Sequence, residues 1–223
     1  MISYDPSQPL IVIHIPKAAG VSSQQFFRHW FGDGYLSHYF DERQGLLPPR
    51  HDLRGLHSEQ RPVVLHGHFN RLRHFGVEDY YPEVQQFITI LRDPFSQFAS
   101  DAGMRRSDAR QWSRLQQHED DSDDARLDWL AAVLQRYLDT RGLIPRGSLV
   151  EVRYRDLISD RVATLERIYS ALGLDLPAAL RSATSPSYRR NRHPELGPEL
   201  KDRIREAYRP FVEAGLFDPA ELA

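Results

Sequence analysis

The chain of 223 residues is 40% hydrophobic and 27% charged, which is the ordinary balance of a globular protein. Its formal net charge of -2 gives no global basic field, so a nucleic-acid partner is not indicated. The absence of cysteine excludes disulfides, thiolate catalysis and cysteine zinc sites. A chain of this length can build one sizeable core, and we expect a single domain over residues 1–223.

Two features of the sequence bear on location. The longest apolar run has about the length of a strand, far short of the roughly 20 residues that a membrane-spanning helix needs. The first six residues lack the basic region and apolar core of a signal peptide. We therefore expect a cytoplasmic protein without a membrane span.

Apolar, β-branched segments alternate with helical patterns along the chain. Strands are expected at residues 10–15, 63–66, 86–91 and 148–152. Between and after them, the sequence predicts helices from about residue 21, after Pro94, and at 128–137, 161–172 and 198–214, with 32–61 mostly loop. This alternation predicts an α/β fold with a central, mainly parallel β-sheet flanked by helices.

The first expected strand leads into a small-residue loop with Lys17, one of only two lysines among 29 basic residues. Such a loop before a helix commonly holds a phosphate-like anion, because backbone N–H groups at the helix start point toward the ligand. The residues expected around the anion are Lys17, Ala18, Ala19, Gly20, Val21, Ser22 and Ser23. The alternative is a plain turn with an exposed lysine. The loop lacks the G-x-x-x-x-G-K-[ST] pattern, which argues against an ATPase or kinase.

A second anion site is indicated where the third expected strand ends, at Leu91-Arg92-Asp93-Pro94. An arginine at the carboxyl end of a central strand faces the crevice where open α/β sheets bind ligands. Ser100 lies two turns into the following helix, and an Arg–Ser pair suits a second phosphate. The alternative is that Arg92 only pairs with Asp93 at the strand end.

His66-Gly67-His68 ends the second expected strand. Alternation along a strand places both histidines on one face, and Gly67 would permit the close approach of a ligand. Because the pKa of histidine lies near neutral, one of the two suits a general base beside an acceptor hydroxyl. The alternatives are structural histidines or a weak metal site that lacks an evident third ligand.

A polar segment at 105–124 ends in the acidic cluster 119–124. We expect a solvated loop or a mobile lid here, with a metal-binding cluster as the alternative.

Together these motifs resemble those of the sulfotransferases that use 3'-phosphoadenosine 5'-phosphosulfate (PAPS). The nearest resemblance is to the carbohydrate group that includes the heparan and uronyl 2-O-sulfotransferases. It rests on three strings within residues 10–105: His14-Ile15-Pro16-Lys17-Ala18-Ala19-Gly20-Val21-Ser22, His66-Gly67-His68, and Leu91-Arg92-Asp93-Pro94 followed by Ser100. The resemblance implies the P-loop-like sulfotransferase fold, a nucleotide donor, an acceptor hydroxyl most often on a glycan, and no required metal.

The resemblance also implies roles for single residues. The Lys17 loop would bind the 5'-phosphosulfate, and Arg92 with Ser100 would bind the 3'-phosphate. His68 would be the catalytic base, with His66 as its neighbour, and Lys17 would stabilise the departing phosphate. A late basic loop would bring Arg189 or Arg190 near the 3'-phosphate.

Two other function classes stay open at this point. A kinase-like phosphotransferase would need magnesium and a nucleoside triphosphate. A non-catalytic protein of the same fold would bind the nucleotide but transfer nothing.

Overall fold

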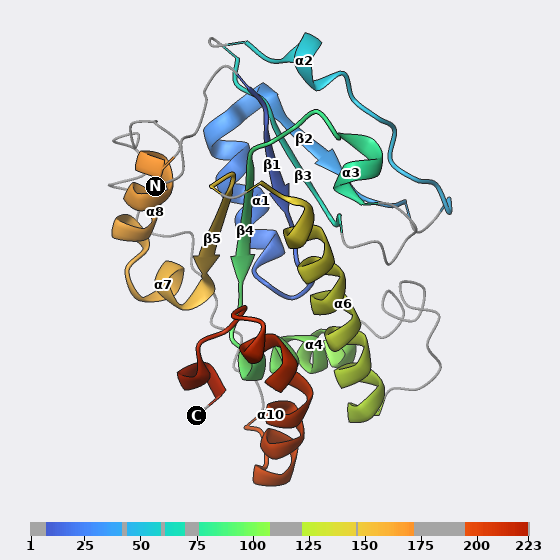
Figure 1. The fold of residues 1–223 in the computed structure, drawn as a ribbon, viewed down its shortest axis with the longest axis vertical. Coiled ribbons are helices and arrows are strands. Elements are labelled where there is room, and N and C mark those ends of the chain that lie inside the picture. The colour runs from blue at the N-terminus through green and yellow to red at the C-terminus, as the bar shows by residue number, and fades with distance from the viewer. Residues whose placement is uncertain are drawn as a thin grey trace.

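The computed structural model describes residues 8–41, 44–58, 61–69, 76–107, 122–145, 147–171 and 195–222. Within them, one five-stranded sheet has the order β2-β3-β1-β4-β5, and every strand pairs with its neighbour in parallel (Figure 1). The strands are β1 (Leu10–Ile13), β2 (Tyr35–His38), β3 (Val64–Gly67), β4 (Phe87–Leu91) and β5 (Leu149–Arg153). The expected α/β fold with a mainly parallel sheet is confirmed.

Helices connect the strands. The longer ones are α1 (Gly20–Phe31), α4 (Pro94–Ser107), α6 (Asp123–Leu143), α8 (Arg161–Ala171) and α10 (Pro198–Glu213). The short ones are η1 (Gly32–Gly34), α2 (Leu53–Leu56), α3 (Val77–Tyr80), α7 (Tyr154–Ser159) and η2 (Pro219–Leu222). Figure 1 shows α4 and α10 at the end of the sheet toward which β4 and β5 run.

Alternation along β1 divides the interior into two layers. Leu10 and Val12 face one side, where buried residues of α1, α7 and α8 cover the sheet. Ile11 and Ile13 face the other side, where α4, α6 and α10 pack. With both faces covered, β1, β3 and β4 are buried along their whole length, which explains why β1 is apolar throughout and β4 is apolar except for Thr89.

Strand β2 lies in the segment that the sequence analysis read as loop with short pieces of structure, without placing a strand there. Tyr35–His38 pairs with Val64–Gly67 at the edge of the sheet, and three of its four residues keep some exposure. Its hydrogen bonds come from a partner almost thirty residues away, and local periodicity carries no trace of such pairing.

Helix α6 begins five residues before its expected start because Ser122 caps it. The Ser122 hydroxyl accepts a hydrogen bond from the N–H of Ala125 at 3.2 Å. Asp123 pairs with Arg126 at 2.9 Å, and Asp124 pairs with Arg203 of α10. Asp123 and Asp124, which were expected in an acidic loop, thus lie in the first turn of a helix. Carboxylates there interact favourably with the helix dipole. Residues 119–121 lie outside the described residues.

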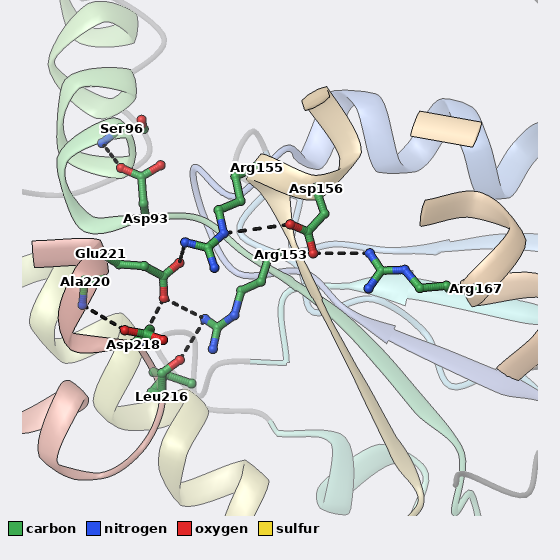
Figure 2. Close-up of polar contacts among 10 residues, drawn as sticks. All are labelled: Asp93, Ser96, Arg153, Arg155, Asp156, Arg167, Leu216, Asp218, Ala220 and Glu221. Atoms are coloured by element: carbon green, nitrogen blue, oxygen red, sulfur yellow. Dashed lines mark hydrogen bonds and ion pairs between the residues drawn. The ribbon is translucent and has the colours of Figure 1, made fainter. Parts of the chain in front are cut away.

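The C-terminal segment docks where β5 ends, as Figure 2 shows. Arg153 donates a hydrogen bond to the carbonyl of Leu216 at 2.8 Å and lies 3.5 Å from the Glu221 carboxylate. Arg155 lies 3.9 Å from the same carboxylate, which is almost fully buried. These contacts fasten the end of the chain to the carboxyl edge of the sheet. No helix in the described part of the chain is both long and apolar enough to cross a membrane.

Candidate active site

The loop between β1 and α1 has a strained backbone. Lys17 and Ala19 have φ angles of 66° and 63°, in the left-handed region that residues with a Cβ seldom adopt. Each such residue costs about 1–3 kcal/mol, so the surrounding structure must hold the loop in place. Strain of this kind often accompanies a binding site.

Side chains from β4 and α4 hold that loop. Thr89 donates to the carbonyl of Ile13 at 2.7 Å, and Gln97 donates to the carbonyl of Pro16 at 2.9 Å. The hydroxyl of Tyr208 on α10 in turn donates to Gln97 at 3.2 Å. The loop is therefore tied directly to β4 and α4, and through Gln97 to α10.

Arg92 connects the two sequence motifs directly. Its Nη1 donates to the carbonyl of Lys17 at 3.2 Å, and its guanidinium lies 4.6 Å from the centre of the Tyr154 ring. Burial lowers the pKa of Arg92, while Tyr154 and Asp93 oppose that shift. Asp93 itself accepts from the N–H of Ser96 at 2.9 Å and so caps α4 (Figure 2). Arg92 therefore makes contacts beyond the expected pair with Asp93.

Both histidines of the His66-Gly67-His68 motif lie against two residues that the sequence analysis did not select, His14 and Tyr39. The His14 ring is 4.4 Å from the ring of His68 and 5.4 Å from that of His66, measured between centroids. The Tyr39 ring is 4.8 Å from His68 and 5.7 Å from His66. The carboxyl ends of β1, β2 and β3 thus bring together a histidine cluster, which we define as His14, Tyr39, His66 and His68.

Hydrogen bonds join three members of the histidine cluster to α1. The Tyr39 oxygen lies 2.9 Å from His14 Nδ1 and 2.5 Å from His66 Nδ1. His66 Nε2 lies 2.9 Å from the Ser23 oxygen, and the Ser23 hydroxyl donates to the carbonyl of Gly20 at 2.9 Å. Ser23 was expected beside the anion, but its buried hydroxyl is engaged by His66 and Gly20.

Burial keeps His14, Tyr39 and His66 uncharged near neutral pH. It lowers the pKa of His66 to about 3, and the charges of His68 and Arg28 act in the same direction. Burial, followed by His68, His66 and Lys17, holds the pKa of His14 well below its usual value. Burial raises the pKa of Tyr39, so its hydroxyl keeps its proton.

Two glycines serve packing at this site. A Cβ on Gly67 would lie 2.2 Å from the carbonyl oxygen of His38, its partner in β2. The neighbouring strand fills the space beside the Cα of Gly67. The expectation that a ligand approaches closely there was therefore wrong. A Cβ on Gly20 would lie 2.0 Å from ring atoms of His14, which shows how closely that ring packs on the start of α1.

The remaining expected site residues are distributed as follows. Ala18 is buried, and Ala19 precedes α1 without a side-chain cap on the helix. Gly20, Val21 and Ser22 form the first residues of α1, and Ser100 lies partly buried in the second turn of α4. Arg189 and Arg190 lie outside the described residues. Within the described residues, no group of three carboxylates or histidines is placed to hold a metal ion.

His14 belonged to a motif already quoted, so the sequence did contain a signal for it. Tyr39 carried none, because it follows a strand that local patterns missed.

Comparison with known proteins points to one family. Residues 69–178, about half the chain, match the sequence model of the sulfotransferase family. This region contains Arg92 and Tyr154, whereas the Lys17 loop and the histidine motif precede it. No curated protein matches the sequence.

Solved structures extend the likeness to nearly the whole chain. The structure of mouse sulfotransferase SULT7A1 complexed with PAP is similar with a TM-score of 0.59 and 13% identity, covering 93% of this chain and 85% of the other. The sulfotransferase domain of the Synechococcus PCC 7002 olefin synthase gives a TM-score of 0.55 and 15% identity, covering 97% of both. A sulfotransferase from Alicyclobacillus acidocaldarius gives a TM-score of 0.53 and 19% identity, covering 92% of this chain and 93% of the other. The fold is that of the sulfotransferases, and family match and fold together support a sulfotransferase.

Proposed function

We propose that this protein is a sulfotransferase that moves a sulfuryl group from PAPS to an acceptor hydroxyl, with His68 as the base. The observation that carries the proposal is the bond from Arg92 to the carbonyl of Lys17. It joins the two residues that would hold the 5'-phosphosulfate and the 3'-phosphate of one nucleotide. The sulfotransferase family match, and a similar structure that is complexed with PAP, support the same donor.

The loop residues fit an anionic nucleotide. Helix α1 begins at Gly20 without a side-chain cap, so backbone N–H groups at its start suit a phosphate. Lys17 adds a mobile point charge, and Arg92 adds a planar cation beside it. Basic side chains and helix N–H groups supply the charge that a metal would otherwise provide.

In the proposed reaction, the acceptor oxygen attacks sulfur as the bond between sulfur and the 5'-phosphate oxygen breaks. The hydroxyl proton passes to His68, and the products are a sulfate ester and 3'-phosphoadenosine 5'-phosphate (PAP). Lys17 neutralises charge on the departing oxygen. As in phosphoryl transfer, most of the rate enhancement comes from alignment and charge stabilisation.

We propose a carbohydrate hydroxyl as the acceptor, on the resemblance of the Lys17 and His68 motifs to the carbohydrate 2-O-sulfotransferases. A screen of labelled PAPS against glycans, phenols and lipids tests this choice. Transfer to a phenol or a lipid but to no glycan would contradict the carbohydrate acceptor, while the proposal of sulfotransferase activity would stand.

Binding measurements on Arg92 test the donor. Arg92→Ala should weaken binding of PAP much more than binding of adenosine 5'-phosphate, because only PAP carries the 3'-phosphate. Titration calorimetry on both ligands measures this difference, and Arg92→Lys shows how far charge alone restores it. Equal losses for both ligands would refute the 3'-phosphate role. Thermal stabilisation by ATP with magnesium, and none by PAP, would favour a kinase instead.

A further inference from the structure

The hydrogen bonds of the histidine cluster run in one direction, and Ser23 sets that direction. A serine hydroxyl has a single hydrogen. The carbonyl of Gly20 can only accept, so the hydrogen of Ser23 goes to that carbonyl, at 2.9 Å. Toward His66, the Ser23 oxygen must therefore act as the acceptor.

The proton positions of His66 follow from this. Its Nε2 lies 2.9 Å from the Ser23 oxygen and must carry the hydrogen of that bond. His66 is neutral, since burial lowers its pKa to about 3, so its other nitrogen, Nδ1, has no hydrogen. Nδ1 accordingly accepts from the Tyr39 hydroxyl, 2.5 Å away.

Tyr39 passes the direction on to His14. Its one hydrogen is given to His66, so its oxygen accepts from His14 Nδ1 at 2.9 Å. A neutral His14 with hydrogen on Nδ1 has a bare Nε2. That Nε2 is buried and has no hydrogen-bond partner within the described part of the chain. It packs against Gly20, where only the absence of a Cβ leaves room for the ring.

We propose that Tyr39 is a positioning residue: its hydroxyl donates to Nδ1 of His66, fixes the hydrogen on Nδ1 of His14, and so holds a neutral His14 ring against His68. The role rests on the proposed function, in which His68 accepts a proton. The His14 ring lies 4.4 Å from His68, between centroids, and a neutral ring there adds no charge to oppose that protonation. Tyr39 directly follows β2, and its hydroxyl bonds His14, which follows β1, and His66 on β3.

Imidazole spectroscopy tests the proton positions without any activity. In ¹⁵N-labelled protein, long-range proton–nitrogen correlations should show hydrogen on Nδ1 of His14 and on Nε2 of His66. Single His14→Asn and His66→Asn variants assign the signals. Tyr39→Phe removes the linking hydroxyl and should change the ring signals of both histidines. Tyr35→Phe is the matched control, because Tyr35 lies on β2, close before Tyr39, with its ring 6.0 Å from that of His66.

Kinetics test the catalytic consequence. Tyr39→Phe should lower kcat by about tenfold to a hundredfold, as small misplacements of reacting groups do, and leave PAP binding unchanged. Wild-type His14 with its hydrogen on Nε2 would overturn the proposal even if the variant did not fold. An unchanged kcat in a folded Tyr39→Phe protein would also overturn it. The expected proton positions without sulfuryl transfer to any acceptor would refute the proposed function alone and leave the hydrogen-bond chain confirmed.

Discussion

Lys17 carries a positive charge, and its backbone has a conformation that residues with a Cβ seldom adopt. Its φ is 66°, and hydrogen bonds to the carbonyls of this loop hold it there. One of them runs from Arg92 to the carbonyl of Lys17 itself. A residue kept at such a φ needs a reason other than stability. The proposed reason is that a compact ammonium group must reach the departing phosphate.

Lys17→Arg keeps the charge but replaces the point charge with a planar fork. We expect kcat to fall by about tenfold to a hundredfold, because the cation no longer meets the departing oxygen in the same geometry. Lys201→Arg, at the other lysine, on α10, is the matched control and should be neutral. A fully active Lys17→Arg enzyme would show that the lysine at this position is not required.

His68→Ala should lower kcat by about 10²–10⁴-fold, the usual contribution of a general base. Binding of PAP should change little, because the base acts on the acceptor hydroxyl. Steady-state rates and calorimetry separate the two effects. Wild-type turnover in this variant would remove His68 from the mechanism.

Among the elements, the junction of β1 with α1 is tightly packed. His14 follows β1 directly and packs on the first residue of α1, so Gly20 is required by a ring and not by its own backbone angle. The His14 ring is also bound to Tyr39, which limits how far it can move aside.

Gly20→Ala should therefore destabilise the protein by about 1–3 kcal/mol, the usual cost of overpacking. Gly142→Ala is the control, because Gly142 lies in α6 with open space around its Cα, and this change should stabilise by about 0.5–1 kcal/mol. Urea denaturation of both variants measures the difference in free energy of unfolding. Equal stability of the two variants would contradict the packing argument.

At the scale of the whole molecule, fully buried histidines make stability depend on pH. Burial lowers the pKa of His66 to about 3 and, followed by the charge of His51, that of His38 to about 4. In the unfolded chain both should titrate near about 6.5. Between these values the unfolded state binds more protons, so stability falls as the pH drops below about 6.5.

Each such histidine contributes up to about 1.4 kcal/mol per pH unit over that window. Urea unfolding at about pH 7.5 and about pH 5 should therefore show a clear loss of stability at the lower pH. Replacing His38 with phenylalanine should reduce the loss, since it removes one of the groups that bind a proton on unfolding. Identical stability at both pH values would show that these histidines are not held in the uncharged form in the folded protein.

The sequence by itself determined the general fold and the order of the motifs along the chain. Continuous apolar strands alternating with helices gave the parallel sheet, and the motifs at Lys17, Arg92 and His68 fell at strand ends because the pattern of each strand is local. Tertiary structure alone decided which of these residues meet. The bond from Arg92 to Lys17 spans β1 and β4, and Tyr39 reaches the histidines only because β2 pairs with β3. Such contacts arise from pairing between distant segments, and no periodicity within one segment records them.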